Sequence, residues 1–380
     1  MKKKRQEMKP AISKSEKSSE LKQDLNRALK IFFRKALRVA LQNPTQAISF
    51  LRTLRWLKKA AYLRAYWMEQ DVSVPPIIIF SITNQCNLEC EGCYARSFHQ
   101  HSPNELNDGQ LRSVVEQARE LGVSFFVIAG GEPLMRPEIL GIMQDFHEMI
   151  FLVFTNGVLI DSHMISQFHK NKNVVPLISL EGDGEETDRR RGKGTYGKIK
   201  QVMEKMRRRG IFFGTSLTLT RPSFPTMTDY RYIQNLVRAG CKFFLYIDYT
   251  PTQKETENWV LTDAQREQVM PLMKSFRSQF PALFIAVPWD EMDVGGCLSA
   301  GRGFIHINAE GDVEPCPFAP FSDANLNHVS LKEALQSDFL KALRQIPELS
   351  EYTGGGCALW KNQEKVISIL QQSRERENRD

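Results

Sequence analysis

Three closely spaced cysteines constrain this chain more than any other feature. Cys86, Cys90 and Cys93 have the spacing C-x3-C-x2-C and follow the apolar run Ile77–Phe80. Thiolates this close together on one loop can converge on a single metal centre. A structural zinc ion takes four protein ligands, and no fourth cysteine or suitably spaced histidine lies nearby. Three thiolates with an open fourth position instead favour a [4Fe–4S] cluster with one iron free for an external ligand.

This cysteine spacing after a first strand resembles the signature of the radical SAM superfamily. The resemblance implies that S-adenosylmethionine (SAM) chelates the open iron through its amino and carboxylate groups. An electron from the cluster then cleaves SAM, and the 5′-deoxyadenosyl radical abstracts hydrogen from a substrate. The sequence departs from the pattern at one position, because Gly92 stands where the family often has an aromatic residue. Tyr94 follows the last cysteine and is the aromatic expected beside the cofactor.

From residue 74 onward, apolar runs alternate with helical patterns. Six such β/α repeats predict parallel strands with right-handed crossovers. The expected strands are Ile77–Ile82, Ser124–Ile128, Ile150–Thr155, Pro176–Leu180, Gly214–Leu219 and Phe243–Tyr249. The expected helices are Asp108–Leu121, Pro137–His147, Ser162–Lys170, Tyr196–Arg209 and Thr228–Ala239. The fold class is therefore α/β, and the resemblance implies a partial (β/α)6 TIM-like barrel with its chemistry at the carboxyl ends of the strands.

Two further segments match motifs that bind SAM in this family. A GGEP segment follows the second strand, and an S-x-E-G segment with a nearby arginine-rich run follows the fourth. The resemblance implies that the first binds the SAM ammonium and the second its carboxylate or ribose, where a guanidinium fork suits a carboxylate. Taken alone, the first could be a turn and the arginine run a solvated loop, and which of Arg189, Arg190 and Arg191 acts is open. The candidate cofactor-binding residues are Gly130, Gly131, Glu132, Pro133, Ser179, Glu181, Arg191 and Tyr94.

A second group of three cysteines lies near the end of the chain. Cys297 and Cys316 flank an expected hairpin in which the strand Phe304–Asn308 turns at Glu310-Gly311, and Cys357 follows a glycine run. The spacing resembles the SPASM or twitch extensions of radical SAM enzymes, which implies an auxiliary [4Fe–4S] cluster with an open or non-cysteine fourth ligand. The alternatives are a structural zinc with His306 or His328, or unrelated core cysteines. The seventh cysteine, Cys241, is expected to be an inert core residue.

The positive charge is concentrated at the N-terminus. The first 67 residues carry 18 lysines and arginines against four acids, whereas the net charge of the chain is +7. After a disordered tail (1–20), two basic amphipathic helices are expected, the second over about 45–68 with an apolar stripe from Ile48 to Ala65. Such an arm could pack on the barrel, lie on an anionic membrane surface, or dock an acidic partner. The expected location is cytoplasmic, with a peripheral position on the inner face of the membrane as an option.

The predicted function is radical hydrogen abstraction from a peptide or protein side chain. The alternatives are radical chemistry on a membrane lipid or lipid-linked molecule, and a non-catalytic iron–sulfur or zinc-binding module. The resemblance implies an electron donor such as flavodoxin or ferredoxin, and no nucleic acid is expected as a partner. The predicted divisions are the tail (1–20), the helical arm (21–73), the core barrel (74–285), the auxiliary-cluster domain (286–360) and a C-terminal helix (361–380).

Overall fold

The computed structural model describes residues 44–98, 102–346, 348 and 357–377. The predicted tail, the first helix of the arm and the glycine run before Cys357 lie outside the described residues. The described part is built on one nine-stranded sheet with the order β7-β6-β5-β4-β3-β2-β1-β8-β9. The strands are β1 Ile77–Ser81, β2 Phe125–Ala129, β3 Ile150–Thr155, β4 Val174–Leu180, β5 Gly214–Leu219, β6 Phe243–Asp248, β7 Leu283–Val287, β8 Phe304–Ile307 and β9 Val313–Glu314.

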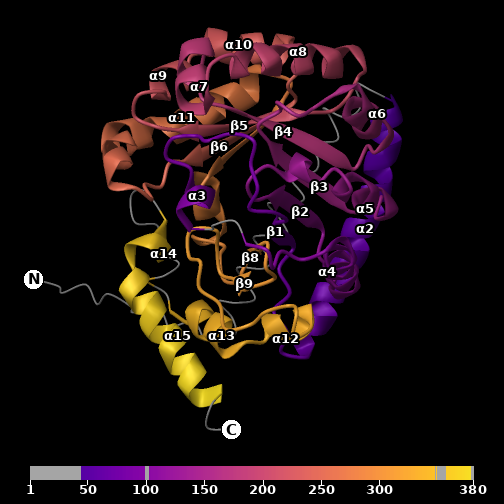
Figure 1. Cartoon of the computed structure of the whole chain (residues 1–380), viewed down its shortest axis with the longest axis vertical. Coiled ribbons are helices and arrows are strands. Elements are labelled where there is room, and N and C mark those ends of the chain that lie inside the picture. Colours follow the sequence, from indigo (N-terminus) through magenta and orange to yellow (C-terminus); the bar gives the residue numbers. More distant parts are fainter. Residues whose placement is uncertain (1–43, 99–101, 347, 349–356, 378–380) are drawn as a thin grey trace, which may run out of the picture.

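Every strand pair from β7 to β8 across this sheet is parallel, so each connection must cross back over the sheet, mostly through a helix. Figure 1 shows the strands inside and these helices around the outside, which is a partial TIM-like barrel. The helices are α2 Pro44–Glu69, α3 Tyr94–Phe98, α4 Asp108–Leu121, α5 Ile139–Asp145, α6 Ser162–Lys170, α7 Gly184–Arg191, α8 Thr195–Arg208, α9 Phe224–Met227, α10 Tyr230–Arg238, α11 Asp263–Gln279, α12 Leu331–Leu335, α13 Asp338–Arg344, α14 Ala358–Lys361 and α15 Gln363–Glu377. Three short 3-10 helices add η1 Pro133–Met135, η2 Lys254–Trp259 and η3 Trp289–Val294. The predicted fold class is confirmed.

Local sequence signals explain why several elements begin where they do. Helix α4 starts at a reciprocal capping box in which Asn107 and Gln110 each bond the other's backbone N–H. Helix α11, which was not predicted, has the same arrangement at Thr262 and Gln265. The strands are rich in β-branched and aromatic residues, and buried positions dominate them because helices cover the barrel outside. Strand β7 was also not predicted, and it crosses the proposed boundary at 285/286.

The predicted hairpin of the C-terminal region is present but belongs to the barrel sheet. Strands β8 and β9 pair antiparallel through His306–Glu314 and Ile307–Val313. On its other edge, β8 pairs parallel with β1 along Ile77–Phe80. The hairpin that lies between Cys297 and Cys316 in the sequence is thereby fixed beside β1, and the loop after β1 carries the first cysteine group.

Helix α2 packs on α4 with a different face from the one predicted. The predicted stripe included Leu51 and Ala65, which are exposed. The buried positions are instead Thr53, Trp56 and Ala60, and Leu63 and Trp67 also pack against the core. Packing of the predicted stripe on the barrel, one of the three options for the arm, therefore does not hold for Leu51 and Ala65. Apolar residues occur on both sides of the helix, so spacing alone does not select the side that meets α4. None of the described helices is both long and apolar enough to cross a membrane.

Candidate functional site

The first cysteine group lies on the loop after β1. The described chain contains no disulfide, and all seven cysteines are free thiols. Cys86 is exposed and Cys90 and Cys93 are partly exposed, and the charge of each of the latter two acts on Cys86. Partial burial is the main cause that raises the pKa of the Cys86 thiol, with smaller contributions from Glu132 and the other two cysteines. These three sulfurs and the Glu132 carboxylate therefore share one electrostatic environment.

Two glycines let the segment after β2 lie directly against this loop. Gly131 N–H donates to Thr83 O at 2.8 Å, and Glu132 N–H donates to Gln85 O at 2.8 Å. A Cβ atom added to Gly131 would lie 2.1 Å from the Gln85 carbonyl oxygen. Gly130 has φ +126°, and a Cβ atom added there would lie 2.3 Å from the Thr83 carbonyl oxygen. Only glycine fits these two positions. The sequence-predicted GG pair thus fixes the start of the cysteine loop.

The Glu132 side chain connects β2 to the end of β3. Its carboxylate is 1% exposed and accepts hydrogen bonds from Thr155 Oγ1 at 2.8 Å, Asn156 N at 2.7 Å and Leu134 N at 3.1 Å. Burial raises the pKa of Glu132, and these three donors act against that shift. Asn156 Nδ2 in turn donates to Asn87 Oδ1 at 2.8 Å, inside the cysteine loop. The carboxylate is held rigidly at the carboxyl ends of two adjacent strands.

The charged run after β4 closes around Glu181. The Glu181 carboxylate is almost completely buried and forms ion pairs with two arginines. Its Oε2 accepts from Arg190, and its Oε1 accepts from Arg191, whose Nε lies 3.0 Å from Oε1. Burial acts to raise the pKa of Glu181, but the two guanidinium groups outweigh it and hold the pKa below its usual range. Arg191 also interacts electrostatically with Cys90 and Cys93. Two positive charges therefore stand between a buried carboxylate and the cysteine loop.

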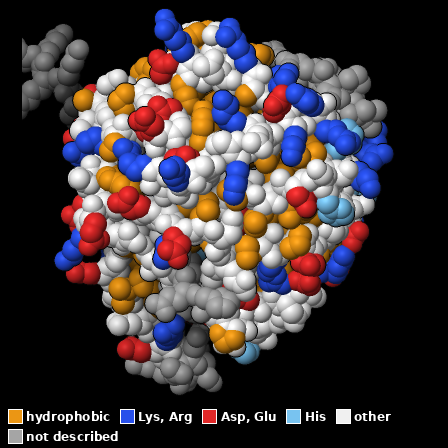
Figure 2. Space-filling model, turned by 45° about the horizontal axis from the view of Figure 1, so that its top comes forward, with side chains coloured by type: hydrophobic (Ala, Val, Ile, Leu, Met, Phe, Trp, Pro, Cys, Tyr) orange, Lys and Arg blue, Asp and Glu red, His pale blue; other side chains and the backbone are white. Residues whose placement is uncertain are grey.

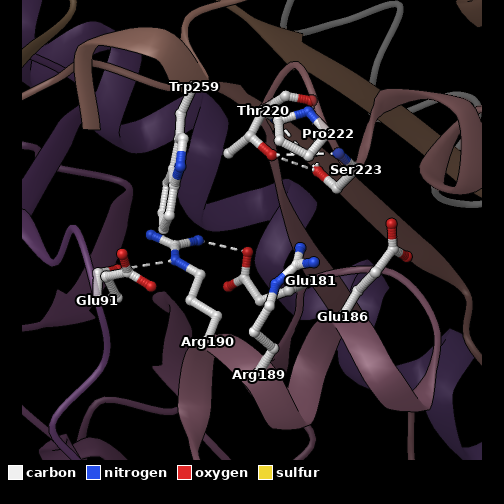
Figure 3. Close-up of a pocket in the computed structure, with 9 residues that line it drawn as sticks. All are labelled: Glu91, Glu181, Glu186, Arg189, Arg190, Thr220, Pro222, Ser223 and Trp259. Atoms are coloured by element: carbon white, nitrogen blue, oxygen red, sulfur yellow. Dashed lines mark hydrogen bonds and ion pairs between the residues drawn. The ribbon is translucent and has the colours of Figure 1, made fainter. Parts of the chain in front are cut away.

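Arg190, which was not singled out from the sequence, ties this charged group to the cysteine loop. Its Nε donates to Glu91 O at 3.1 Å, and Glu91 N–H donates back to Arg190 O at 3.2 Å. Its guanidinium also faces the Tyr249 and Trp259 rings, each 5.8 Å from the ring centre. Figure 3 shows Arg190 reaching between Glu91 and Glu181 and turned toward Trp259. The sequence gives no signal for this contact, because the three consecutive arginines look alike until the chain folds.

The same two aromatic rings lie against Gly92, where the family pattern often has an aromatic residue. Gly92 has φ +63°, and a Cβ atom there would lie 2.6 Å from Tyr249 Oη and 3.1 Å from the Trp259 ring. No larger side chain fits this position without movement. Tyr249 and Trp259, which come from the end of β6 and from η2, fill the space instead.

A pocket of about 280 Å³ opens beside these residues. It is bounded on one side by the arginine run of α7 and on the other by the loop after β5. Its lining residues, drawn in Figure 3, are Glu91, Glu181, Glu186, Arg189, Arg190, Thr220, Pro222, Ser223 and Trp259. Cavities of this size lie at the lower end of the range for small-molecule sites.

The second cysteine group also comes together in space. The Cys316 thiol donates a hydrogen bond to the Cys357 sulfur, which raises the pKa of Cys316 and lowers that of Cys357. Cys297 interacts electrostatically with both, and burial raises its pKa to about 12. Cys241, by contrast, is fully buried just before β6 and interacts with neither group.

Tyr94 lies on the side of the cysteine loop that faces this second group. Its ring packs on Phe318 with a centroid separation of 5.2 Å. Burial is the main cause that raises the pKa of its hydroxyl, and the neighbouring charges are those of Cys93, Cys316 and Glu314. The Tyr94 hydroxyl is therefore near one cysteine of each group. Its expected place beside SAM stays a prediction.

The family model described as the radical SAM superfamily matches residues 80–229, which span the cysteine loop, Glu132 and the Glu181–Arg191 group. This match places a radical SAM domain within residues 80–229 of the chain. Enzymes of this superfamily use a [4Fe–4S] cluster and SAM, and the predicted enzyme class is confirmed.

Curated relatives of this radical SAM chain include synthases and a maturase. An AdoMet-dependent heme synthase of Oleidesulfovibrio alaskensis is 24% identical over 314 residues, which cover 74% of this chain and 79% of that protein. The mycofactocin maturase MftC of Mycolicibacterium smegmatis is 25% identical over 268 residues, or 66% of each chain. Among solved structures, Streptococcus suis SuiB bound to S-adenosylmethionine has a TM-score of 0.62 at 17% identity and covers 76% of this chain and 72% of its own. These structural likenesses show the radical SAM fold.

The residues of the first group fit an iron–sulfur cluster better than a single ion. Among the described residues, no three His, Cys, Asp or Glu side chains lie close enough to hold one metal ion. The cysteine ligands of a cubane cluster bind different irons, so their sulfurs do not have to converge on one point. The three thiols of the cysteine loop are unpaired and share one environment. Two of them, Cys90 and Cys93, interact with the positive charge of Arg191, which would offset the negative charge of a thiolate-bound cluster.

The remaining predicted residues occupy less decisive positions. Ser179 Oγ accepts a hydrogen bond from Ser216 Oγ at 3.1 Å on the neighbouring strand β5, and Pro133 begins the short helix η1. His306, the candidate zinc ligand, is buried and bonds Glu314 at 2.6 Å and Ser81 at 2.8 Å. Both of its nitrogens therefore already have protein partners.

Proposed function

We propose that this chain is a radical SAM enzyme in which Cys86, Cys90 and Cys93 bind the SAM-cleaving cluster. When bound, the [4Fe–4S] cluster supplies the electron that cleaves SAM to a 5′-deoxyadenosyl radical, which then abstracts hydrogen from the substrate. The observation that carries this proposal is the position of the three thiols between Glu132, after β2, and Arg191, after β4. The carboxyl ends of strands are where barrel enzymes hold their chemistry.

The chain's own residues would hold SAM by complementary charge. Glu132 presents a buried carboxylate suited to the SAM ammonium group, because three protein donors already orient it. Arg191 presents a guanidinium that suits the SAM carboxylate, with Glu181 fixing its direction. Gly130, Gly131 and Pro133 would shape the wall beside Glu132, and Ser179 would add a hydroxyl from β4.

The best-supported substrate class is a peptide or protein side chain. A mycofactocin maturase is among the relatives, and two structural neighbours are SuiB with its precursor peptide SuiA and anSMEcpe with the Cp18Cys peptide. Heme synthases also occur among the relatives, so a tetrapyrrole belongs in any substrate screen. A small reducing protein of the flavodoxin or ferredoxin type would serve as the electron donor.

Formation of 5′-deoxyadenosine by the reduced, anaerobically reconstituted protein tests this proposal. We expect 5′-deoxyadenosine to form when SAM is added. A peptide fraction of host extract should increase its formation more than a lipid fraction or a tetrapyrrole fraction does. Cys90→Ala should abolish the nucleoside and remove about four irons, because one cluster ligand is lost. Cys241→Ala is the matched control, since this thiol is far from both groups. Equal nucleoside from Cys90→Ala and the unchanged protein would contradict the proposal.

A lipid-linked substrate at a membrane surface is the second candidate, favoured by the outward face of α2. Tyr62 is 73% exposed and Leu51 is 53% exposed. The exposed basic residues Arg52, Arg55, Lys58 and Lys59 are on the same helix. Lysine and arginine side chains are spread over the face seen in Figure 2, with acidic side chains between them. Co-sedimentation with anionic vesicles tests this candidate. Binding that is lost in a variant combining Tyr62→Ser, Lys58→Gln and Lys59→Gln would support it, and unchanged binding would count against it.

A further inference from the structure

Glu291 lies beside the second cysteine group and has no role in the function proposed above. It belongs to η3, which ends three residues before Cys297. Gly296 N–H donates to the Glu291 backbone oxygen at 3.0 Å, and Leu298 N–H donates to its carboxylate Oε2 at 3.3 Å. The two residues on either side of Cys297 are thus both bonded to Glu291. This pair of bonds holds Glu291 against the backbone on both sides of Cys297.

The same carboxylate interacts electrostatically with two of the three cysteines. Glu291 interacts with Cys357, and Cys297 interacts with Glu291 and Cys357. Cys316 interacts with Cys297 and bonds Cys357. The carboxylate therefore shares the surroundings of the second cysteine group, and each of the four groups is a ligand type that binds iron.

The Glu291 carboxylate is partly exposed, and one of its two oxygens is available to a further ligand. Oε2 accepts the Leu298 N–H, and the hydrogen bonds of the described residues include none to Oε1. Arg302 is a neighbouring positive charge for both Glu291 and Cys297.

We propose that Glu291 supplies the fourth protein ligand of an iron–sulfur cluster held by Cys297, Cys316 and Cys357. The inference rests on the auxiliary cluster that the resemblance implies for these three cysteines, and it adds the ligand that the cysteines do not provide. All seven cysteines of the chain are placed, and the other four are either in the first group or remote at β6. A cubane cluster with three thiolates has one iron left, and a carboxylate oxygen fills that position.

The test isolates the second cluster in the full-length protein. Cys86→Ala, Cys90→Ala and Cys93→Ala together remove the first site, and the protein is then reconstituted without oxygen. This background should hold about four irons, with one iron distinguished by oxygen ligation in its Mössbauer spectrum. In the same background, Glu291→Gln keeps the acceptor for Leu298 N–H but removes the anionic ligand. We expect an altered EPR signal of the reduced cluster and a higher midpoint potential, since the cluster loses one negative charge.

Two further variants make each outcome decisive. Glu291→Cys should keep about four irons but lose the oxygen-ligated iron from the Mössbauer spectrum. Glu310→Gln is the matched control, because only the backbone of Glu310 makes hydrogen bonds in the β8–β9 turn. A Glu291→Gln protein with the iron content, EPR signal and potential of the background would overturn the assignment, as would iron loss that Glu291→Cys does not restore. Absence of iron from the background itself would instead remove the second cluster, and the inference with it, while leaving the first cluster untouched.

Discussion

Charge pairing around Glu181 decides how the residues after β4 are arranged. One buried carboxylate accepts from two arginines whose side chains are only 12% and 13% exposed. Breaking such a pair leaves an uncompensated buried charge, which costs far more than an exposed pair contributes. Because Arg190 also bonds the backbone at Glu91, the stability of this ion group is coupled to the geometry of the cysteine loop.

Glu181→Gln should lower the free energy of unfolding of the cluster-free protein by about 3 kcal/mol at pH 7. Glu204→Gln is the control, because its pair with Arg208 is exposed and should be worth less than about 0.5 kcal/mol. The pKa of Glu181 is lower in the folded protein than in the unfolded chain. The stabilisation that the Glu181 carboxylate contributes is therefore complete at pH values above the ordinary glutamate pKa of about 4.3. It is lost as the pH falls through the lower pKa of the folded protein. Urea unfolding should show the free energies of unfolding of Glu181→Gln and of the unchanged protein converging at acid pH. A difference that stays constant with pH would contradict this.

Gly92→Ala should destabilise the cysteine loop for two separable reasons. A non-glycine residue at φ +63° costs about 1–2 kcal/mol, and the new Cβ atom would meet Tyr249 Oη. Tyr249→Phe removes that oxygen together with its 2.7 Å hydrogen bond to Thr256. The double variant should therefore lose less free energy of unfolding than the sum of the two single variants.

Gly141→Ala is the control for the Gly92 variants, since no atom lies within 4 Å of its Cβ position in α5. Replacing this helical glycine should stabilise the protein by up to about 1 kcal/mol. Strict additivity of Gly92→Ala and Tyr249→Phe would show that the tyrosine oxygen does not restrict position 92.

At the level of elements, α2 shows how a helix can be predicted correctly and its orientation missed. Its bounds, Pro44–Glu69, agree closely with the predicted span of about 45–68. Its aromatic residues divide between the two sides, since Trp56 is 6% exposed and Tyr62 is 73% exposed. Arg64 also faces inward and donates to Gly122 O and to Ser124 Oγ at 2.9 Å. A basic residue that serves the buried face cannot be recognised from periodicity.

Trp56→Ala should cost about 3 kcal/mol or more of the free energy of unfolding, because a large side chain is removed from the contact with α4. Tyr62→Ala on the opposite side should change it by less than about 0.5 kcal/mol. Guanidinium chloride unfolding of the two variants measures the difference. Similar midpoints for both would mean that α2 does not depend on its inner face for its position.

At the level of the whole molecule, the sequence predicted what local patterns can encode. Strands β3 and β5 have the predicted bounds, and the three motifs lie at the carboxyl ends of β1, β2 and β4. The pairing of β8 with β1 was not predicted, because Ile77 and Phe304 are joined by contacts that no short-range pattern specifies. The roles of Arg190, Tyr249 and Glu291 escaped prediction for the same reason, since each depends on a partner distant in sequence or on the local fold.

The β1–β8 pairing leads to a prediction about the proposed boundary at 285/286. A chain that ends at residue 285 loses part of β7 and all of β8, so the backbone edge of β1 at Ile78 and Phe80 becomes exposed. It also loses the buried side chains of α12 and α13, among them Phe339 and Leu340. We expect this chain to lose cooperative thermal unfolding and to expose its β1 amides to rapid hydrogen exchange. A chain that begins at Pro44 keeps every described element and should unfold like the full protein. Cooperative unfolding of the 285-residue chain at the temperature of the full protein would instead establish the barrel as an independent folding unit.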